Sequence, residues 1–125
     1  MRICVVGTGY VGLVVGTCLA DQGSHVHCVD RDAGKIQGLT EGKIPIYEPG
    51  LEDIFRRVVR EGRLSFSTDA DGAMAQADVI FIAVGTPPAE DGSADLQAVL
   101  AVADQIGAAI SGPVTVVIKS TVPVG

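Results

Sequence analysis

The fold is decided by one stretch near the N-terminus, which reads Val5-Val6-Gly7-Thr8-Gly9-Tyr10-Val11-Gly12. A short apolar run precedes its glycines, and an apolar, helix-like segment follows them. The glycines have the spacing Gly-x-Gly-x-x-Gly, and each has a physical task in a strand–turn–helix unit. The first allows the tight turn, the second lets a pyrophosphate approach the backbone, and the third lets the helix pack close to the strand. The stretch therefore predicts a dinucleotide site at a helix N-terminus.

An acidic residue completes this pattern. Asp30 stands at the end of the next predicted strand, where a carboxylate accepts hydrogen bonds from both ribose hydroxyls of the adenosine half. The same carboxylate would repel a 2′-phosphate, so the pattern favours NAD over NADP. Arg31 instead favours NADP, because an arginine at this place can accommodate the 2′-phosphate. Lys35, one turn into the following helix, either reaches a ribose hydroxyl or is an ordinary surface lysine.

Strands and helices alternate along the whole chain. Apolar runs predict strands at residues 2–6, 24–30, 64–67, 78–84 and 114–119. Helical patterns lie between them at residues 10–22, from Asp30 or Asp32 to Gly42, and at 49–60, 69–76 and 95–110. This alternation predicts an α/β fold, a Rossmann-type doubly wound parallel sheet with helices on both faces. Right-handed crossovers give the strand order 3-2-1-4-5.

The composition is typical of one soluble domain. The 125 residues are 47% hydrophobic and 19% charged, which allows a real core. The net charge of −6, without a basic run, argues against nucleic acid or an anionic membrane as a partner. No apolar stretch is long enough to span a bilayer, and no secretory signal is recognisable.

The cysteines form no recognisable set. Cys4, Cys18 and Cys28 are odd in number and too widely spaced for a disulfide framework or a zinc site. We predict that all three are reduced residues of the core, where thiols are poor nucleophiles. Reduced thiols indicate the cytoplasm, and no metal site is predicted.

Two further segments are expected beside the glycine turn. Ligands of doubly wound sheets bind beyond the carboxyl ends of the strands, where the strand order reverses. Gly85-Thr86-Pro87 and Ser120-Thr121-Val122-Pro123 reach that edge, and their threonines are either ligand contacts or ordinary turn residues. His25 and His27 lie near the start of their strand and are interpreted as strand-edge residues. The residues thus predict a cofactor site without a nucleophile or a general base.

Five ordered blocks are distributed along the whole chain. They are residues 1–13 around the glycines, Val29-Asp30 with Lys35-Ile36, Pro45-Ile46-Tyr47-Glu48-Pro49-Gly50-Leu51, Val84-Gly85-Thr86-Pro87, and Lys119-Ser120-Thr121-Val122-Pro123-Val124-Gly125. Together they resemble the nucleotide-sugar dehydrogenases that act on UDP-glucose and GDP-mannose. The resemblance implies oxidation of the C6 alcohol of a nucleotide sugar to a carboxylate, in two steps and with two NAD.

The resemblance also implies roles for single residues. Asp30 and Lys35 would hold the adenosine ribose, with Arg31 beside them, and Thr86 would line the NAD site. Ser120 and Thr121 would lie near the nicotinamide, where Thr121 would help to position a catalytic water. The residues implied to bind the pyrophosphate are Gly7, Gly9, Tyr10, Val11 and Gly12.

The chain departs from the full-length enzymes in its length. The resemblance implies a central helix, a C-terminal UDP-sugar-binding domain and a catalytic cysteine, lysine and asparagine that this sequence lacks. We therefore expect residues 1–125 to be the NAD-binding domain of such an enzyme, which as a full-length protein would bind the nucleotide sugar and form a homo-oligomer. A stand-alone NAD-binding or regulatory module, and a dehydrogenase of the 6-phosphogluconate or hydroxyacyl type, are the alternatives. The choice between UDP-glucose and GDP-mannose stays open.

Overall fold

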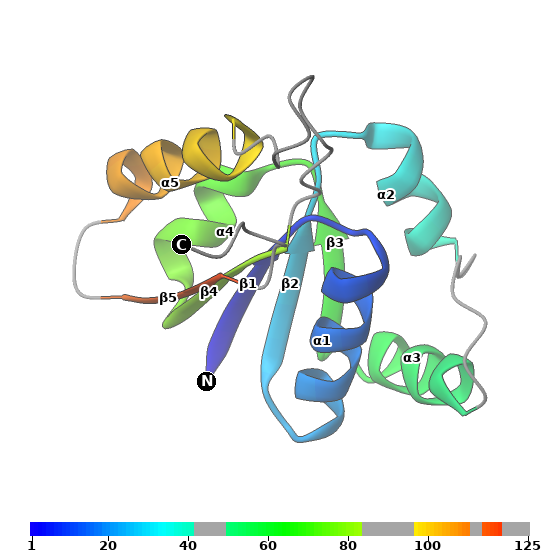
Figure 1. Cartoon of the computed structure of the whole chain (residues 1–125). Coiled ribbons are helices and arrows are strands. Elements are labelled where there is room, and N and C mark those ends of the chain that lie inside the picture. The colour runs from blue at the N-terminus through cyan, green and yellow to red at the C-terminus, as the bar shows by residue number, and fades with distance from the viewer. Residues whose placement is uncertain (42–49, 84–96, 111–113, 119–125) are drawn as a thin grey trace, which may run out of the picture.

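Five parallel strands form one sheet (Figure 1). The computed structural model describes residues 1–41, 50–83, 97–110 and 114–118. The strands are β1 (Arg2–Val6), β2 (His25–Val29), β3 (Leu64–Ser67), β4 (Val79–Ile82) and β5 (Thr115–Ile118). Their order is β3-β2-β1-β4-β5, and every neighbouring pair is parallel. The predicted topology is therefore confirmed.

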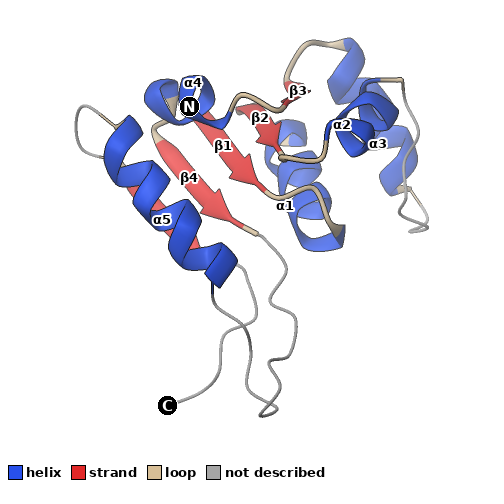
Figure 2. Ribbon diagram, turned by 90° about the horizontal axis from the view of Figure 1, so that it is seen from above, coloured by secondary structure: helices blue, strands red, loops and turns tan. Residues whose placement is uncertain are grey.

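Helices lie on both faces of this sheet, as Figures 1 and 2 show. They are α1 (Tyr10–Asp21), α2 (Ala33–Thr40), α3 (Leu51–Arg60), α4 (Ala70–Gln76) and α5 (Gln97–Ala109). Asp32 caps α2 by accepting hydrogen bonds from the backbone N–H groups of Gly34 and Lys35, which decides between the two predicted starts. The other helix starts expected near Pro49 and Asp95 lie outside the described residues, as does Gly42.

The core has two halves because side chains alternate across the strands. Ile3 and Val5 of β1 face α1 and α3, and the largest buried side chain on that side is Phe55. Cys4 and Val6 face the opposite side, where Met74 of α4 and Ile106 of α5 cover them. β1 is thus buried on both faces, as expected for a central parallel strand.

β3 and the first part of β2 are apolar on one face only. Val26 and Cys28 of β2 pack into the core below α1, whereas His25 is exposed and His27 half-buried on the other face. On β3, which pairs with β2, Ser65 and Ser67 lie on the same face as the two histidines. An alternation of apolar and polar residues with a period of two is typical of a strand that has one solvent-accessible face. This explains the polar residues at His25, His27, Ser65 and Ser67.

One expectation about the cysteines was wrong. Cys4 and Cys28 are fully buried, but Cys18 is exposed on α1. The buried face of α1 is formed by positions such as Leu13, Thr17 and Ala20, and helical periodicity turns the residue after Thr17 toward solvent.

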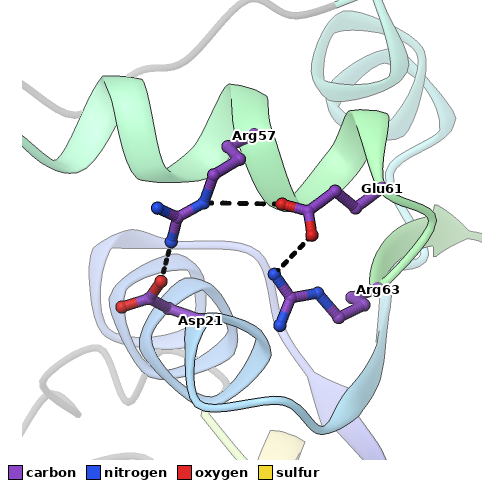
Figure 3. Close-up of polar contacts among 4 residues, drawn as sticks. All are labelled: Asp21, Arg57, Glu61 and Arg63. Atoms are coloured by element: carbon purple, nitrogen blue, oxygen red, sulfur yellow. Dashed lines mark hydrogen bonds and ion pairs between the residues drawn. The ribbon is translucent and has the colours of Figure 1, made fainter.

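A chain of ion pairs links α1 to α3 at the edge remote from the glycine turn (Figure 3). Arg57 of α3 pairs with Asp21 at the end of α1, and its Nε lies 3.5 Å from Glu61 Oε1. Glu61 Oε2 in turn lies 2.7 Å from Arg63 Nη2. Arg57 and both of its carboxylate partners are exposed, so this network lies at the surface of the protein. Within the described residues, no helix is long and apolar enough to cross a membrane.

Candidate functional site

The glycine turn joins β1 to α1. Gly7 has a φ of 106°, a left-handed conformation that favours glycine, and its N–H donates to the carbonyl oxygen of Val29 at 2.8 Å. Gly9 is the N-cap of α1, and no side chain caps the helix there. A Cβ built on Gly9 meets no atom within 4 Å. The turn therefore leaves open space directly before the N-terminus of α1, which is where a pyrophosphate fits.

Gly12 has a different task. A Cβ built there would lie 2.0 Å from the carbonyl oxygen of Gly7 and 3.5 Å from the Cβ of Ala83. The first turn of α1 consequently packs directly on the backbone of the turn before it. This is the close helix–strand packing that the third glycine of the motif was predicted to allow.

Asp30 follows β2 and is bound to the glycine turn. Its Oδ2 accepts hydrogen bonds from the Thr8 hydroxyl at 2.8 Å and the Thr8 backbone N–H at 3.0 Å. Its Oδ1 accepts a hydrogen bond from the backbone N–H of Asp32 at 2.9 Å. The carboxylate is thus fixed beside the loop that would hold the phosphates, at the carboxyl end of its strand.

These contacts also keep Asp30 ionised. Partial burial by itself raises the pKa of a carboxyl group, but here the donors from Asp32 and Thr8 and the charge of Lys35 outweigh it. The net result is a pKa below the usual 3.8. At neutral pH the group is therefore an acceptor for hydroxyl donors and repels a phosphate.

Of the other residues predicted at the ribose, Lys35 is exposed in the first turn of α2, and its charge helps to lower the pKa of Asp30. Arg31 is exposed beside Asp30 in the chain. Tyr10 and Val11 are the first two residues of α1. Three predicted site residues, Thr86, Ser120 and Thr121, lie outside the described residues.

The two histidines are remote from this site, and one of them was misjudged. His27 is not a strand-edge residue, because its Nδ1 lies 2.6 Å from Ser65 Oγ and its Nε2 lies 2.8 Å from Ser67 Oγ. Both histidines line a groove of about 570 Å³ between α4 and the polar face of β2 and β3. Burial lowers the pKa of His27, against the opposing charge of Asp69.

This pKa shift predicts a pH dependence of stability. A histidine whose pKa in the folded protein is below 6.5 binds more protons when unfolded, so the free energy of unfolding falls as the pH drops below about 6.5. We expect His27→Gln to reduce this fall between pH 7 and the pKa of the folded state, as measured by urea unfolding at several pH values. His25→Gln, on the same strand but exposed, is the matched control. A His27→Gln variant with the full pH dependence of the unchanged protein would contradict this assignment.

The described residues contain no group of three His, Cys, Asp or Glu side chains that could hold a metal ion.

The sequence interpretation overlooked Thr8, which is 3% exposed and contacts Asp30 through two atoms. The available signal was a hydroxyl between the first two glycines, at the point where β1 ends beside β2.

An open glycine turn at the point where the strand order reverses, with an ionised carboxylate fixed beside it, is how doubly wound domains bind a dinucleotide. The chain is therefore a dinucleotide-binding domain of the Rossmann class. Its family is more specific. Residues 1–125 match the UDP-glucose/GDP-mannose dehydrogenase family, NAD binding domain, and the chain belongs to that family. Its cofactor is accordingly NAD.

Individual relatives agree with this assignment. The UDP-glucose 6-dehydrogenase of Pseudomonas aeruginosa is 54% identical over 100% of this chain and 28% of its own length. The solved GDP-mannose dehydrogenase of Pseudomonas aeruginosa is similar with a TM-score of 0.91 and 44% identity, over 98% of this chain and 29% of that one. The solved UDP-glucose dehydrogenase of Pyrobaculum islandicum is similar with a TM-score of 0.89 and 46% identity, over 97% of this chain and 29% of that one. The chain spans less than a third of the length of these relatives.

Proposed function

We propose that this chain is the NAD-binding domain of a UDP-glucose 6-dehydrogenase. The observation that carries the proposal is the ionised carboxylate of Asp30, held by Thr8 against an open glycine turn. The substrate class is supported by similarity, because the UDP-glucose relative from Pseudomonas aeruginosa is 54% identical and the GDP-mannose enzyme 44%. GDP-mannose 6-dehydrogenase is the alternative activity, and a substrate screen with both nucleotide sugars separates the two.

The proposed reaction converts a C6 alcohol into a carboxylate. Two hydrides leave C6, water supplies the second oxygen of the carboxylate, and three protons are released. NAD, when bound, accepts the hydrides. The residues of this chain would bind and orient the cofactor: the turn from Gly7 to Gly12 at the pyrophosphate, with Asp30 and Lys35 at the ribose. Thr86, Ser120 and Thr121 belong to the proposal as further cofactor contacts, with Thr121 also placing a water.

In the proposed enzyme, the nucleotide sugar and the covalent chemistry belong mainly to parts of the protein other than this domain, since its relatives are more than three times as long. Support comes from the thiols, since Cys4 and Cys28 are buried and burial raises the pKa of Cys4 to about 12. Neither is therefore a nucleophile at neutral pH, and the exposed Cys18 lies in the last turn of α1, at the end of that helix remote from the glycine turn. A homo-oligomeric full-length enzyme in the cytoplasm is part of the same proposal. Size-exclusion chromatography with light scattering, and fractionation of cells, test these two parts.

The first test of the proposal is cofactor preference. We expect NAD to bind more tightly than NADP, because the Asp30 carboxylate accepts from a ribose hydroxyl and repels a 2′-phosphate. Asp30→Ala should weaken NAD binding by about 1–3 kcal/mol, the range for hydrogen bonds to a charged group. Isothermal titration calorimetry measures both quantities. Asp53→Ala, an exposed carboxylate in the first turn of α3, is the control. Equal or tighter NADP binding would overturn the prediction and make Arg31 a phosphate contact.

The second test is catalysis. We expect this chain by itself to show no oxidation of UDP-glucose, UDP-mannose-type sugars or GDP-linked sugars at any NAD concentration. The reaction needs a nucleophile, a general base and groups that stabilise developing charge, and the described residues do not bring such a set together at the glycine turn. NADH absorbance is the readout, with the Thr121→Ala variant measured beside the unchanged chain. Turnover that persists in that variant would mean that the active site has been misplaced.

A further inference from the structure

Thr8 is almost completely buried, yet both of its donors point to one acceptor. The residue is 3% exposed, and its hydroxyl and backbone N–H both reach Asp30 Oδ2, at 2.8 and 3.0 Å. A carboxylate is only an acceptor, so the Thr8 hydroxyl is the donor in the shorter bond. Charge-assisted hydrogen bonds of this kind are among the stronger ones in proteins.

We propose that Thr8 is a positioning residue for NAD, which orients the Asp30 carboxylate toward the adenosine ribose. This inference rests on the proposed function, since it needs Asp30 to contact the ribose. Oδ2 is held by Thr8 and Oδ1 by the backbone N–H of Asp32. Rotation of the carboxylate about its terminal bond would break these contacts together. The group is thus oriented before the ligand arrives, and binding does not have to order it.

The position of Thr8 makes this link specific to the site. Thr8 stands between Gly7, whose N–H binds the end of β2, and Gly9, where the open space for the phosphates begins. A hydroxyl here connects the phosphate-binding turn to the ribose-binding carboxylate of the next strand. Valine has nearly the same shape as threonine but no hydroxyl, whereas serine keeps the hydroxyl and loses only a methyl group.

The test compares Thr8→Val with Thr8→Ser. Calorimetry should show NAD binding roughly five- to tenfold weaker in Thr8→Val, the effect of one lost hydrogen bond, and within about twofold of the unchanged protein in Thr8→Ser. Carbon-13 NMR of the Asp30 carboxyl group should show a higher pKa in Thr8→Val than in Thr8→Ser, since only the former loses a donor to the charged form. Thr8→Ala replaces Thr8→Val if the valine variant does not fold.

A double-mutant cycle shows whether Thr8 acts through Asp30. In an Asp30→Asn background, we expect Thr8→Val to cause a much smaller loss of NAD affinity than in the unchanged protein. The same loss in both backgrounds, or no loss in either, overturns the inference. Failure of the unchanged protein to bind NAD would instead overturn the proposed function. In that case the NMR comparison still reports whether Thr8 controls the Asp30 carboxylate.

Discussion

Replacing Gly12 by alanine is expected to destabilise the domain by more than about 3 kcal/mol, at the upper end of the cost of overpacking. The added Cβ would lie 2.0 Å from the carbonyl oxygen of Gly7, a distance that real Cβ atoms do not show. The atom it meets belongs to the backbone, so no side-chain rotation relieves the clash. α1 would have to move away from β1, and the buried contacts of Leu13 would be lost with it.

Urea unfolding measures this effect, and Gly107→Ala is its control. Gly107 is an exposed residue of α5 at which an added Cβ meets nothing within 4 Å. Because glycine is unfavourable in a helix interior, Gly107→Ala should stabilise the domain by about 0.5–1 kcal/mol. The same chemical change would thus have opposite signs at the two sites. If Gly12→Ala were as stable as the unchanged chain, the described packing of α1 on the turn would be wrong.

Replacing Gly9 by valine is expected to abolish NAD binding and leave the domain folded. Gly9 has φ −74° and ψ −170°, extended backbone that valine adopts readily, and open space surrounds the position of its Cβ. The free energy of unfolding should therefore fall by no more than about 1 kcal/mol, the cost of a poor N-cap residue in place of glycine. The side chain would occupy the place of the pyrophosphate, and this steric conflict cannot be relieved without moving the ligand.

Calorimetry with NAD and urea unfolding must both be run on the Gly9→Val variant, because the prediction separates affinity from stability. Gly107→Ala, which lies far along the chain on α5, should bind NAD like the unchanged protein. A normal NAD affinity for Gly9→Val would show that the glycine turn is not the phosphate site. Loss of folding together with loss of binding would show that Gly9 has a structural task like that of Gly12.

The glycine spacing predicted the strand–turn–helix unit on which the candidate site is built. Gly7, Gly9 and Gly12 are placed by the chain itself, with fixed separations along one turn, so their spatial relation follows from the spacing. The apolar runs predicted the strand order because right-handed crossovers leave few alternatives. Asp30 was predictable for the same reason, since parallel neighbouring strands bring their carboxyl ends to one edge.

The residues that sequence reasoning misjudged depend on tertiary contacts. The role of Thr8 needs the distance between the turn and the end of β2, which no local pattern contains. His27 is bound by serines that lie on a different strand, 38 and 40 residues further along the chain. The exposure of Cys18 follows from the helical period of α1, but only once the face that packs on the sheet is known. Thr86 and Thr121 lie outside the described residues, so the roles assigned to them stay predictions.

The uneven placement of the three thiols makes this domain suited to site-selective labelling. Cys18 is exposed on α1, whereas Cys4 and Cys28 are fully buried and burial raises the pKa of both. A maleimide dye should therefore attach to one cysteine of the folded protein and to all three after denaturation. A fluorophore at Cys18 would sit on the helix whose first turn faces the proposed pyrophosphate site, without altering any residue of that site. The count of reactive thiols would at the same time report the folded fraction of every variant.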